Sequence, residues 1–484
     1  MTHPSLFTDY PEAIEGFDDK EQTTVKPGTV ILTCKPFAYS LSAKYYLIRC
    51  DTCLKEEESS DENHGHHLSR CSGCQLVRYC DRDCQKKGWF DGHKYECKGF
   101  KTHREVAGSF TRLLLRIIVK LQNGNDYYDE ITHKKIRRRF KDLVSHYSDL
   151  KCHQRRMEQV EVMGKVVESI LKFHPEIKMP NQSELLGICG RIFVNTFSLT
   201  DHECHTLGAG LYLGASIFDH SCDPMAVANF EGTTICIRNV KSIPKGMPIE
   251  KVTICYKDPL RPSAIRKEQL KNHYYFECQC DRCTTKLHDR LMGCIVCPNK
   301  SCGNEVHPVE DKFQCKKCGH QFDTEFSEKF KEIEEFCIEK AEEIVETAYV
   351  DVCEVCMNVM RKSHFSDTHW LMLEMLSGGF DACVELKKWD KAYEYGLQYL
   401  VGLRKYMPEN WPPLGLSLLR MAKLSWFLEK EAEAKMFIAE AKAILDITHG
   451  PNSRFFLQNV VPLIREIALC TEFRRAMNEP RPRR

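Results

Sequence analysis

Cysteine is the residue that most constrains how this chain can fold. The 484 residues include 27 cysteines, several of them in Cys-x2-Cys pairs with histidine nearby. In a short secreted chain this density indicates disulfides, but this chain is long, and residues 1–16 contain no apolar run that could serve as a secretory signal. We therefore expect an intracellular protein whose cysteines bind metal ions as thiolates.

The densest cluster lies in residues 50–97, where seven cysteines and the last of the four histidines follow a zinc-ligand spacing. These residues are Cys50, Cys53, Cys71, Cys74, Cys80, Cys84, His93 and Cys97. Zinc takes four thiolate or imidazole ligands in a tetrahedron, so eight such residues make two sites. Because closed sites of this kind usually replace a missing hydrophobic core, we expect both to be structural.

Two more clusters follow. Three thiolates lie within residues 278–283, and Cys222 is the candidate fourth ligand of their site. The three are Cys278, Cys280 and Cys283. The next cluster has the spacing of a small zinc ribbon, which predicts a fourth zinc site. Its ligands are Cys297, Cys302, Cys315 and Cys318. Cys294 is either spare or takes the place of Cys297.

Charge and hydropathy exclude several classes of protein. The net charge of +1 and the spacing of the cysteines argue against a DNA-binding zinc protein. The basic run at residues 133–141 is expected to be a solvated helix face, not a nucleic-acid contact. The longest apolar stretch, residues 110–121, carries Arg112, Arg116 and Lys120, which indicates an amphipathic core helix and no membrane span.

The pattern of the remaining chain predicts a mixed fold. Residues 29–33 and 45–48 are β-like, residues 100–185 are helical in pattern, and residues 190–258 return to strands and turns. From about residue 326 to 475 the pattern is almost continuously helical. Residues 388–395 and 430–437 form a faint repeat, 42 residues apart, which favours stacked hairpins of tetratricopeptide type, although any antiparallel helical bundle could produce it.

The first cluster resembles a MYND finger, including the stretches Arg78-Tyr79-Cys80 and Cys84-Gln-Lys-Lys-Gly-Trp89. The resemblance implies that one zinc ion binds Cys50, Cys53, Cys80 and Cys84. It implies that the other binds Cys71, Cys74, His93 and Cys97. MYND fingers usually bind peptide segments, so the resemblance also implies a protein partner.

Three later segments, in their order and spacing, resemble the SET domain of the SMYD family. They are Asp219-His-Ser-Cys-Asp-Pro224, Thr253-Ile-Cys-Tyr256 and Phe276-Glu-Cys-Gln-Cys-Asp-Arg-Cys283. The resemblance implies a protein-lysine N-methyltransferase that uses S-adenosylmethionine, with Tyr256 as the catalytic residue that orients the target amine. It implies that the cofactor is bound by Gly16, Asn195, Asp219, His220, Tyr256 and Phe276.

The expected fold is therefore α+β, with a β-rich SET domain that is split by the finger and followed by zinc modules and an all-α domain. The expected parts are the N-terminal part of the SET domain (1–49), the MYND finger (50–97), a helical SET insert (98–189), the SET core (190–258), a post-SET zinc segment (259–283), a zinc ribbon-like segment (284–325) and a helical tetratricopeptide-like domain (326–484). We expect a monomeric chromatin regulator of nucleus and cytoplasm that acts on a histone or another protein.

The sequence departs from the family pattern on the cofactor side. Asp18 occupies the position of a glycine, and Asp219 and Met225 replace two asparagines. Asparagine both donates and accepts hydrogen bonds, whereas an ionised aspartate only accepts. These changes leave an alternative hypothesis, in which the chain is a weak or inactive zinc-binding adaptor that binds protein partners through its finger and helical domain.

Overall fold

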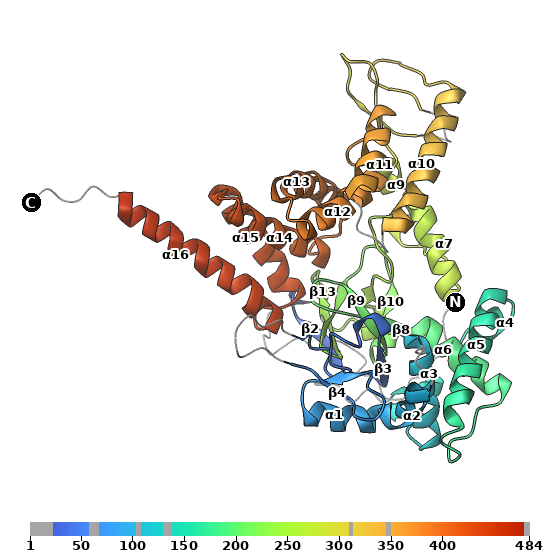
Figure 1. Cartoon of the computed structure of the whole chain (residues 1–484). Helices are drawn as coiled ribbons and strands as arrows, with labels where there is room; N and C mark the ends of the chain where they lie inside the picture. The colour runs from blue at the N-terminus through green and yellow to red at the C-terminus, as the bar shows by residue number, and fades with distance from the viewer. Residues whose placement is uncertain are drawn as a thin grey trace, which may run out of the picture. The chain divides into compact units, whose positions relative to one another are not determined.

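The structure is a computed structural model that describes residues 23–57, 67–102, 108–128, 138–308, 313–344 and 350–478. It confirms the predicted α+β fold (Figure 1). The chain divides into two compact units, each built from separate stretches of chain. The first unit comprises Met1–Asp219, Met225–Ile254 and Lys271–Phe276. The second comprises His220–Pro224, Cys255–Leu270 and Glu277–Arg484.

Two antiparallel three-stranded sheets form the β part of the first unit. One has the order β11-β12-β2, with β2 at Val30–Cys34, β11 at Ala226–Glu231 and β12 at Thr234–Asn239. The other has the order β3-β9-β8, with β3 at Ala38–Leu41, β8 at Thr196–Thr200 and β9 at Thr206–Leu211. Strands from before residue 42 thus pair with strands from after residue 195, so the intervening residues are an insertion in this β unit.

The insertion contributes most of the helices of the first unit. They are α1 (Arg82–Gly88), α2 (Lys94–Thr102), α3 (Ser109–Gln122), α4 (Tyr147–Lys151), α5 (Gln154–Leu171) and α6 (Gln182–Asn195), together with a π-helical turn at Trp89–His93. Helix α3 packs on β3, β9, α5 and α6, and its residues from Thr111 to Val119 are buried. It is therefore the centre of the hydrophobic core of this unit.

Short strands complete the first unit. They are β1 (Thr24–Val25) with β13 (Ile243–Pro244), β4 (Ser69–Arg70) with β5 (Arg78–Tyr79), β6 (Tyr127–Tyr128) with β7 (Arg138–Arg139), and β14 (Thr253–Ile254). Strand β10 (Asp219–His220) and helix α7 (Ser263–Tyr274) each contribute residues to both units.

The second unit is mainly helical. After α8 (Asp281–Thr284), α9 (Leu287–Met292) and the strand pair β15 (Ile295–Val296) and β16 (Glu305–Val306), seven longer helices follow in its described residues. These are α10 (Thr324–Ile344), α11 (Val350–Lys362), α12 (Trp370–Glu385), α13 (Trp389–Tyr406), α14 (Pro412–Phe427), α15 (Glu431–Thr448) and α16 (Val461–Asn478). From α10 to α16 each helix packs against the next one along the chain, and α16 also packs against the turn that precedes it. Buried side chains from all of these helices form one large hydrophobic core.

The repeat predicted at residues 388–395 and 430–437 is a repeated turn between helices. Lys387 and Glu429, 42 residues apart, are both left-handed, with φ of 56° and 59°. In each turn, the backbone N–H of the residue after the left-handed one donates to the carbonyl five residues before it, at 2.8 Å. The alanine four residues farther along, Ala392 or Ala434, is fully buried. The hairpins α12–α13 and α14–α15 therefore share one local geometry, as stacked tetratricopeptide-type hairpins do.

Two local predictions were wrong. At residues 45–48, where a β-like segment was predicted, the chain completes a 3-10 helix (Ala43–Tyr45) and continues as a turn. In the basic run, residues 133–137 lie outside the described part of the chain, but Arg138 lies in β7, is buried and donates to the carbonyl of Leu213 at 3.3 Å. Among the described helices, none has the length and apolar composition that a membrane span needs.

Candidate functional site

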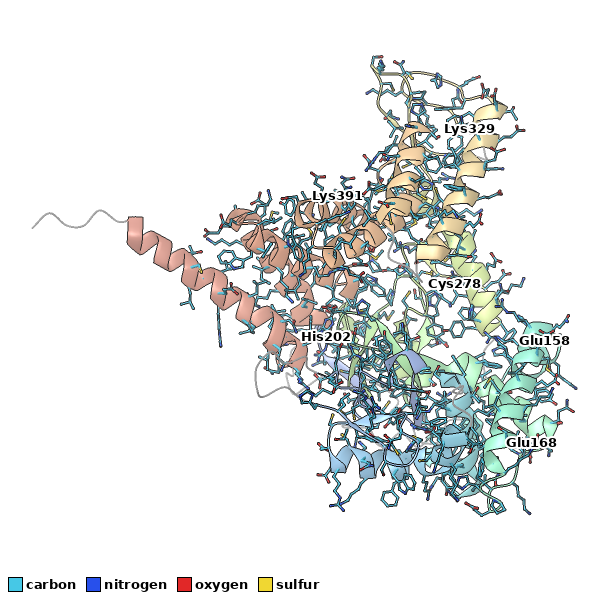
Figure 2. All side chains as sticks on the ribbon, viewed as in Figure 1. Glu158, Glu168, His202, Cys278, Lys329 and Lys391 are labelled. Carbon is cyan, nitrogen blue, oxygen red and sulfur yellow. The ribbon has the colours of Figure 1, made fainter. Side chains whose placement is uncertain are left out.

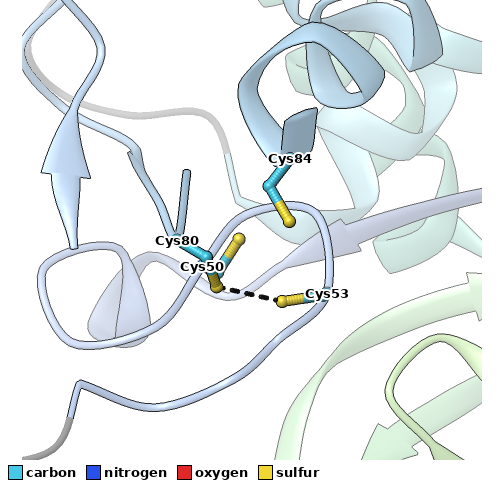
Figure 3. A group of neighbouring side chains, drawn as sticks. All are labelled: Cys50, Cys53, Cys80 and Cys84. Atoms are coloured by element: carbon cyan, nitrogen blue, oxygen red, sulfur yellow. Dashed lines mark hydrogen bonds between the residues drawn. The ribbon is translucent and has the colours of Figure 1, made fainter. Parts of the chain in front are cut away.

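The first group of metal-binding side chains contains four cysteine sulfurs within 4.8 Å of one another (Figure 3). They belong to Cys50, Cys53, Cys80 and Cys84. Cys80 directly follows β5, and Cys84 lies in the first turn of α1, where its amide donates to the N-cap residue Asp81 at 2.7 Å. The Sγ atoms of Cys53 and Cys80 are 3.3 Å apart.

The second group lies in the same segment and interleaves with the first. It consists of Cys71, Cys74, His93 and Cys97. Nε2 of His93 lies 3.4 Å from Sγ of Cys71 and 3.6 Å from Sγ of Cys74. Gly73 lies so close that a Cβ atom there would be 2.6 Å from Sγ of Cys97, so a larger residue would displace a sulfur of the group.

Buried charges connect this second group to helix α3. Nδ1 of His93 lies 3.4 Å from Oε2 of Glu96, so the carboxylate holds the ring with its other nitrogen toward the sulfurs. Glu96 in turn accepts hydrogen bonds from Arg112 and Arg116, at distances from 2.7 to 3.2 Å. Both arginines also contact Asp51, which lies between ligands of the first group.

The charges in this cluster balance, since two carboxylates face two guanidinium groups. The four side chains are at most 2% exposed. The paired arginines hold the pKa of Glu96 well below its usual range, despite the opposing effect of burial. Both finger groups are therefore tied to the core helix of the first unit by ionised, mutually satisfied side chains.

The third group lies in the second unit and consists of Cys222, Cys278, Cys280 and Cys283. Cys278, labelled in Figure 2, follows α7, and Sγ of Cys222 lies 4.0 Å from its sulfur and 3.5 Å from that of Cys283. The fully buried Arg266 donates from Nε to Cys222 at 3.2 Å and from Nη2 to Cys283 at 3.3 Å. A buried cation thus offsets part of the negative charge that four thiolates would bring.

The fourth group consists of Cys297, Cys302, Cys315 and Cys318. Cys297 lies 3.5 Å from Cys318 between sulfurs, and Cys302 lies 3.6 Å from Cys315. Cys294 is fully buried outside this group, where burial raises the pKa of its thiol. Of the two alternatives that the sequence leaves open, the structure favours Cys297 as the ligand.

The donor sets fit zinc. A tetrahedral ion with Zn–S bonds of about 2.3 Å separates its sulfurs by about 3.8 Å. The sulfur pairs above are 3.3–4.0 Å apart. Four thiolates, or three thiolates and an imidazole, form the closed structural sites that this metal prefers. The chain is therefore a zinc-binding protein.

Next to the third group, His220 connects Cys222 to Tyr256. Nδ1 of His220 accepts a hydrogen bond from the backbone N–H of Tyr256 at 3.0 Å, and Nε2 lies 3.2 Å from Sγ of Cys222. The two rings are 5.3 Å apart between centroids. Burial lowers the pKa of His220 to about 4, so the imidazole is neutral at physiological pH.

The other residues predicted to bind the cofactor belong to the first unit. Asn195 ends α6, and its Nδ2 group donates to the carbonyls of Val144 and Arg191, both at 2.8 Å. Asp219 is exposed, and the ring of Phe276 lies 6.4 Å from that of Tyr274. Gly16, with the neighbouring Asp18, lies outside the described residues.

Comparison with known proteins gives the family. The family model of the MYND finger matches residues 50–97. The chain is 28% identical to the human histone-lysine N-methyltransferase SMYD3, with 92% of this chain and 93% of the relative covered. It is 26% identical to the N-lysine methyltransferase SMYD2-A of Xenopus laevis, with 93% and 98% covered. It is 28% identical to the histone-lysine N-methyltransferase ASHR1 of Arabidopsis thaliana, with 89% of each chain covered. The chain belongs to the SMYD family.

Several contacts of this SMYD chain were missed by the sequence analysis. Arg112 and Arg116 were interpreted only as the charged residues of an amphipathic helix, and Asp51 and Glu96 were not considered. The available signal was position, since both carboxylates directly adjoin zinc-ligand cysteines. Arg266 carried no such signal, because its contact with the third group depends on how α7 packs.

The second unit of this SMYD chain also contains a cavity of about 330 Å³. Its wall includes Asp258, two residues beyond Tyr256, and one stripe of α12 formed by Trp370, Glu374 and Asp381. Arg261 pairs with Glu374 at 2.5 Å and lies 5.9 Å from the Trp370 ring centroid. The cavity therefore combines carboxylates and an aromatic wall with one lining arginine.

Proposed function

We propose that this chain is a protein-lysine N-methyltransferase that uses S-adenosylmethionine. The proposal is carried by the similarity over 89–93% of the chain to relatives that are named as lysine methyltransferases. S-adenosylmethionine supplies a methyl group on a sulfonium, and the enzyme's task is to bring a neutral lysine amine in line with it. In this proposal the hydroxyl of Tyr256 orients the amine.

The proposed cofactor residues fit this role with altered chemistry. Asn195 uses its Nδ2 group within the protein, so its contribution to the cofactor is the acceptor Oδ1. Asp219 offers only acceptors, where the family pattern has asparagine. Phe276 offers an aromatic face. We propose that these residues bind amine groups and the adenine ring of the cofactor.

Calorimetric titration of the zinc-loaded chain with S-adenosylmethionine tests the proposal. We expect a dissociation constant in the micromolar range, about −8 kcal/mol. Incubation of the loaded protein with lysine-containing peptides should then add 14 Da per methyl group, about the mass of CH₂, as detected by mass spectrometry. A folded, zinc-loaded chain that releases no heat would contradict the proposal.

The carboxylates that line the cavity in the second unit favour a substrate that carries positive charge near the target lysine. Its three carboxylates belong to Asp258, Glu374 and Asp381, and Asp381 is already paired with Arg420 at 2.5 Å. With Glu374 paired to Arg261, the third carboxyl group is that of Asp258, which accepts from the Leu260 N–H at 2.9 Å and whose pKa is raised by burial, so a cationic substrate group beside it would stabilise its ionised form. Peptides with arginine beside the acceptor lysine should therefore have a lower KM than matched peptides with glutamate, and Asp258→Asn should reduce the difference.

The MYND finger offers a second surface that could bind another protein. Trp89 and Phe90, in the turn before His93, are 41% and 74% exposed. We propose that they bind a peptide segment of a partner, which fluorescence polarisation with proline-containing peptides and the variant Phe90→Ala can test.

We also propose that the protein acts in nucleus and cytoplasm, which microscopy of a fluorescent fusion can test.

A further inference from the structure

His220 lies between the third zinc group and the segment that carries Tyr256, and it contacts both with its ring nitrogens. Nδ1 is 3.0 Å from the backbone nitrogen of Tyr256, and Nε2 is 3.2 Å from Sγ of Cys222. All three residues belong to the second unit. The imidazole of His220 is therefore held through both of its ring nitrogens.

The contacts define the tautomer of this imidazole. A backbone N–H can only donate, so Nδ1 of His220 must be the unprotonated, accepting nitrogen. The hydrogen of the neutral ring then resides on Nε2, where it is directed to the sulfur of Cys222. A zinc-bound thiolate is a better acceptor than a thiol, because it carries negative charge. Metal binding at the third group thus strengthens the contact that fixes the ring.

A second donor fixes the sulfur itself. Arg266 is fully buried and donates to Cys222 and Cys283, and it also donates to the backbone carbonyl of Arg261. The segment from Tyr256 to Arg261 is therefore attached to the zinc group at both of its ends. Once zinc holds the four cysteines, the ring of His220 has little freedom to rotate.

We propose that His220 is a positioning residue that holds the backbone of Tyr256 in place and takes its own orientation from the third zinc group. The catalytic part of this role rests on the proposed function, because it matters for reaction only if Tyr256 orients the amine. The positional part does not. Zinc at the third group would then be part of the active-site geometry as well as of the fold.

Nuclear magnetic resonance of the full-length, zinc-loaded protein, with ¹⁵N in its histidine rings, tests the tautomer without any substitution. We expect His220 to be neutral, with its hydrogen on Nε2. The signal can be assigned by its absence from His220→Asn. Hydrogen on Nδ1 would overturn the proposal, because that nitrogen could not then accept from Tyr256.

Hydrogen exchange measured by mass spectrometry tests the positioning, in peptides that cover residues 253–258. In His220→Ala we expect the Tyr256 amide to exchange about tenfold faster, because it loses the acceptor that His220 provides and, with it, about 1.4 kcal/mol of protection. His220→Asn should restore part of the protection, since its Oδ1 can accept. Unchanged exchange in His220→Ala would overturn the proposal.

A matched control is His205→Ala, which removes an exposed imidazole from the first unit. It should leave exchange at residues 253–258 and the zinc content unchanged. In methylation assays, His220→Ala should lower kcat more than it raises the KM for the peptide. If the wild-type chain transfers no methyl group, the proposed function fails, whereas the exchange result still decides the role of His220.

Discussion

Arg112 and Asp51 form a bidentate ion pair, with Nη1 2.8 Å from Oδ1 and Nη2 2.9 Å from Oδ2. The residues are 61 positions apart in sequence, and their side chains are at most 1% exposed. Asp51 lies between two ligands of the finger, and Arg112 lies on the core helix α3. This pair, with Glu96 and Arg116, makes the finger an integral part of the first unit.

Replacing Arg112 by methionine should destabilise the protein strongly. Asp51 and Glu96 would then share one remaining arginine, and breaking a buried charge network by removing one partner costs about 3–5 kcal/mol. Urea denaturation followed by circular dichroism measures the change. Glu56→Gln, which breaks an exposed pair with Arg49, is the control and should cost less than about 1 kcal/mol. Equal effects of the two variants would contradict an anchoring role for the network.

Replacing Cys302 should lower the zinc content of the protein, whereas replacing Cys294 should not. The structure contains four groups of Cys and His in its described residues, so we expect four zinc ions per chain. Cys302→Ser should lower this number by one, because three thiolates hold zinc poorly in a structural site. Cys294→Ser should leave it unchanged. Metal analysis by plasma mass spectrometry measures both, and loss of zinc from the Cys294 variant would reverse the assignment of the ligand.

Tyr256→Phe should reduce methyl transfer while the protein remains folded. The substitution removes only the hydroxyl that is proposed to orient the amine, and loss of orientation costs on the order of 10²-fold in rate. Single-turnover assays with a saturating cofactor measure the effect. Tyr147→Phe, which removes an exposed hydroxyl near Ser183, is a matched control that should keep normal activity. Wild-type turnover in the Tyr256 variant would rule out the proposed role.

Glycine should stabilise the two repeated turns of the helical domain. Lys387 and Glu429 have left-handed backbones, which cost non-glycine residues roughly 1 kcal/mol. Lys387→Gly and Glu429→Gly should therefore each raise the free energy of unfolding by about 0.5–1 kcal/mol. Lys388→Gly is the control, because φ is −87° there and no strain is relieved. Calorimetric melting measures the three variants, and a uniform loss of stability would contradict the strain argument.

Local patterns in the sequence were sufficient for much of the fold. The spacing of Cys297, Cys302, Cys315 and Cys318 describes a group whose sulfurs the structure brings together. The 42-residue repeat was visible because small residues such as Ala392 and Ala434 recur where helices pack closely. The α+β class follows from the change between strand and helix periods along the chain.

Contacts that depend on packing could not be predicted in the same way. His220 was expected beside the adenine of the cofactor, a role that stays a prediction, and its contact with the Tyr256 backbone was not foreseen. Arg138 was expected to be solvated and is buried. In both cases the partner is distant in sequence, and neither periodicity nor composition indicates which distant atoms a side chain will contact.

The cysteines of the third zinc group are separated in sequence by residues 225–254, which belong to the first unit. Cys222 precedes these residues, and its three partners follow them. Translation that stops anywhere before residue 283 therefore yields a polypeptide with an incomplete set of thiolates. On a ribosome, about 60 further residues are synthesised before the last partner of Cys222 is made, which takes about 3–12 seconds at roughly 5–20 residues per second. During that interval Cys222, joined near its end by Cys278 and Cys280, lacks a complete zinc site, which is a natural point for a chaperone or a metal donor to act.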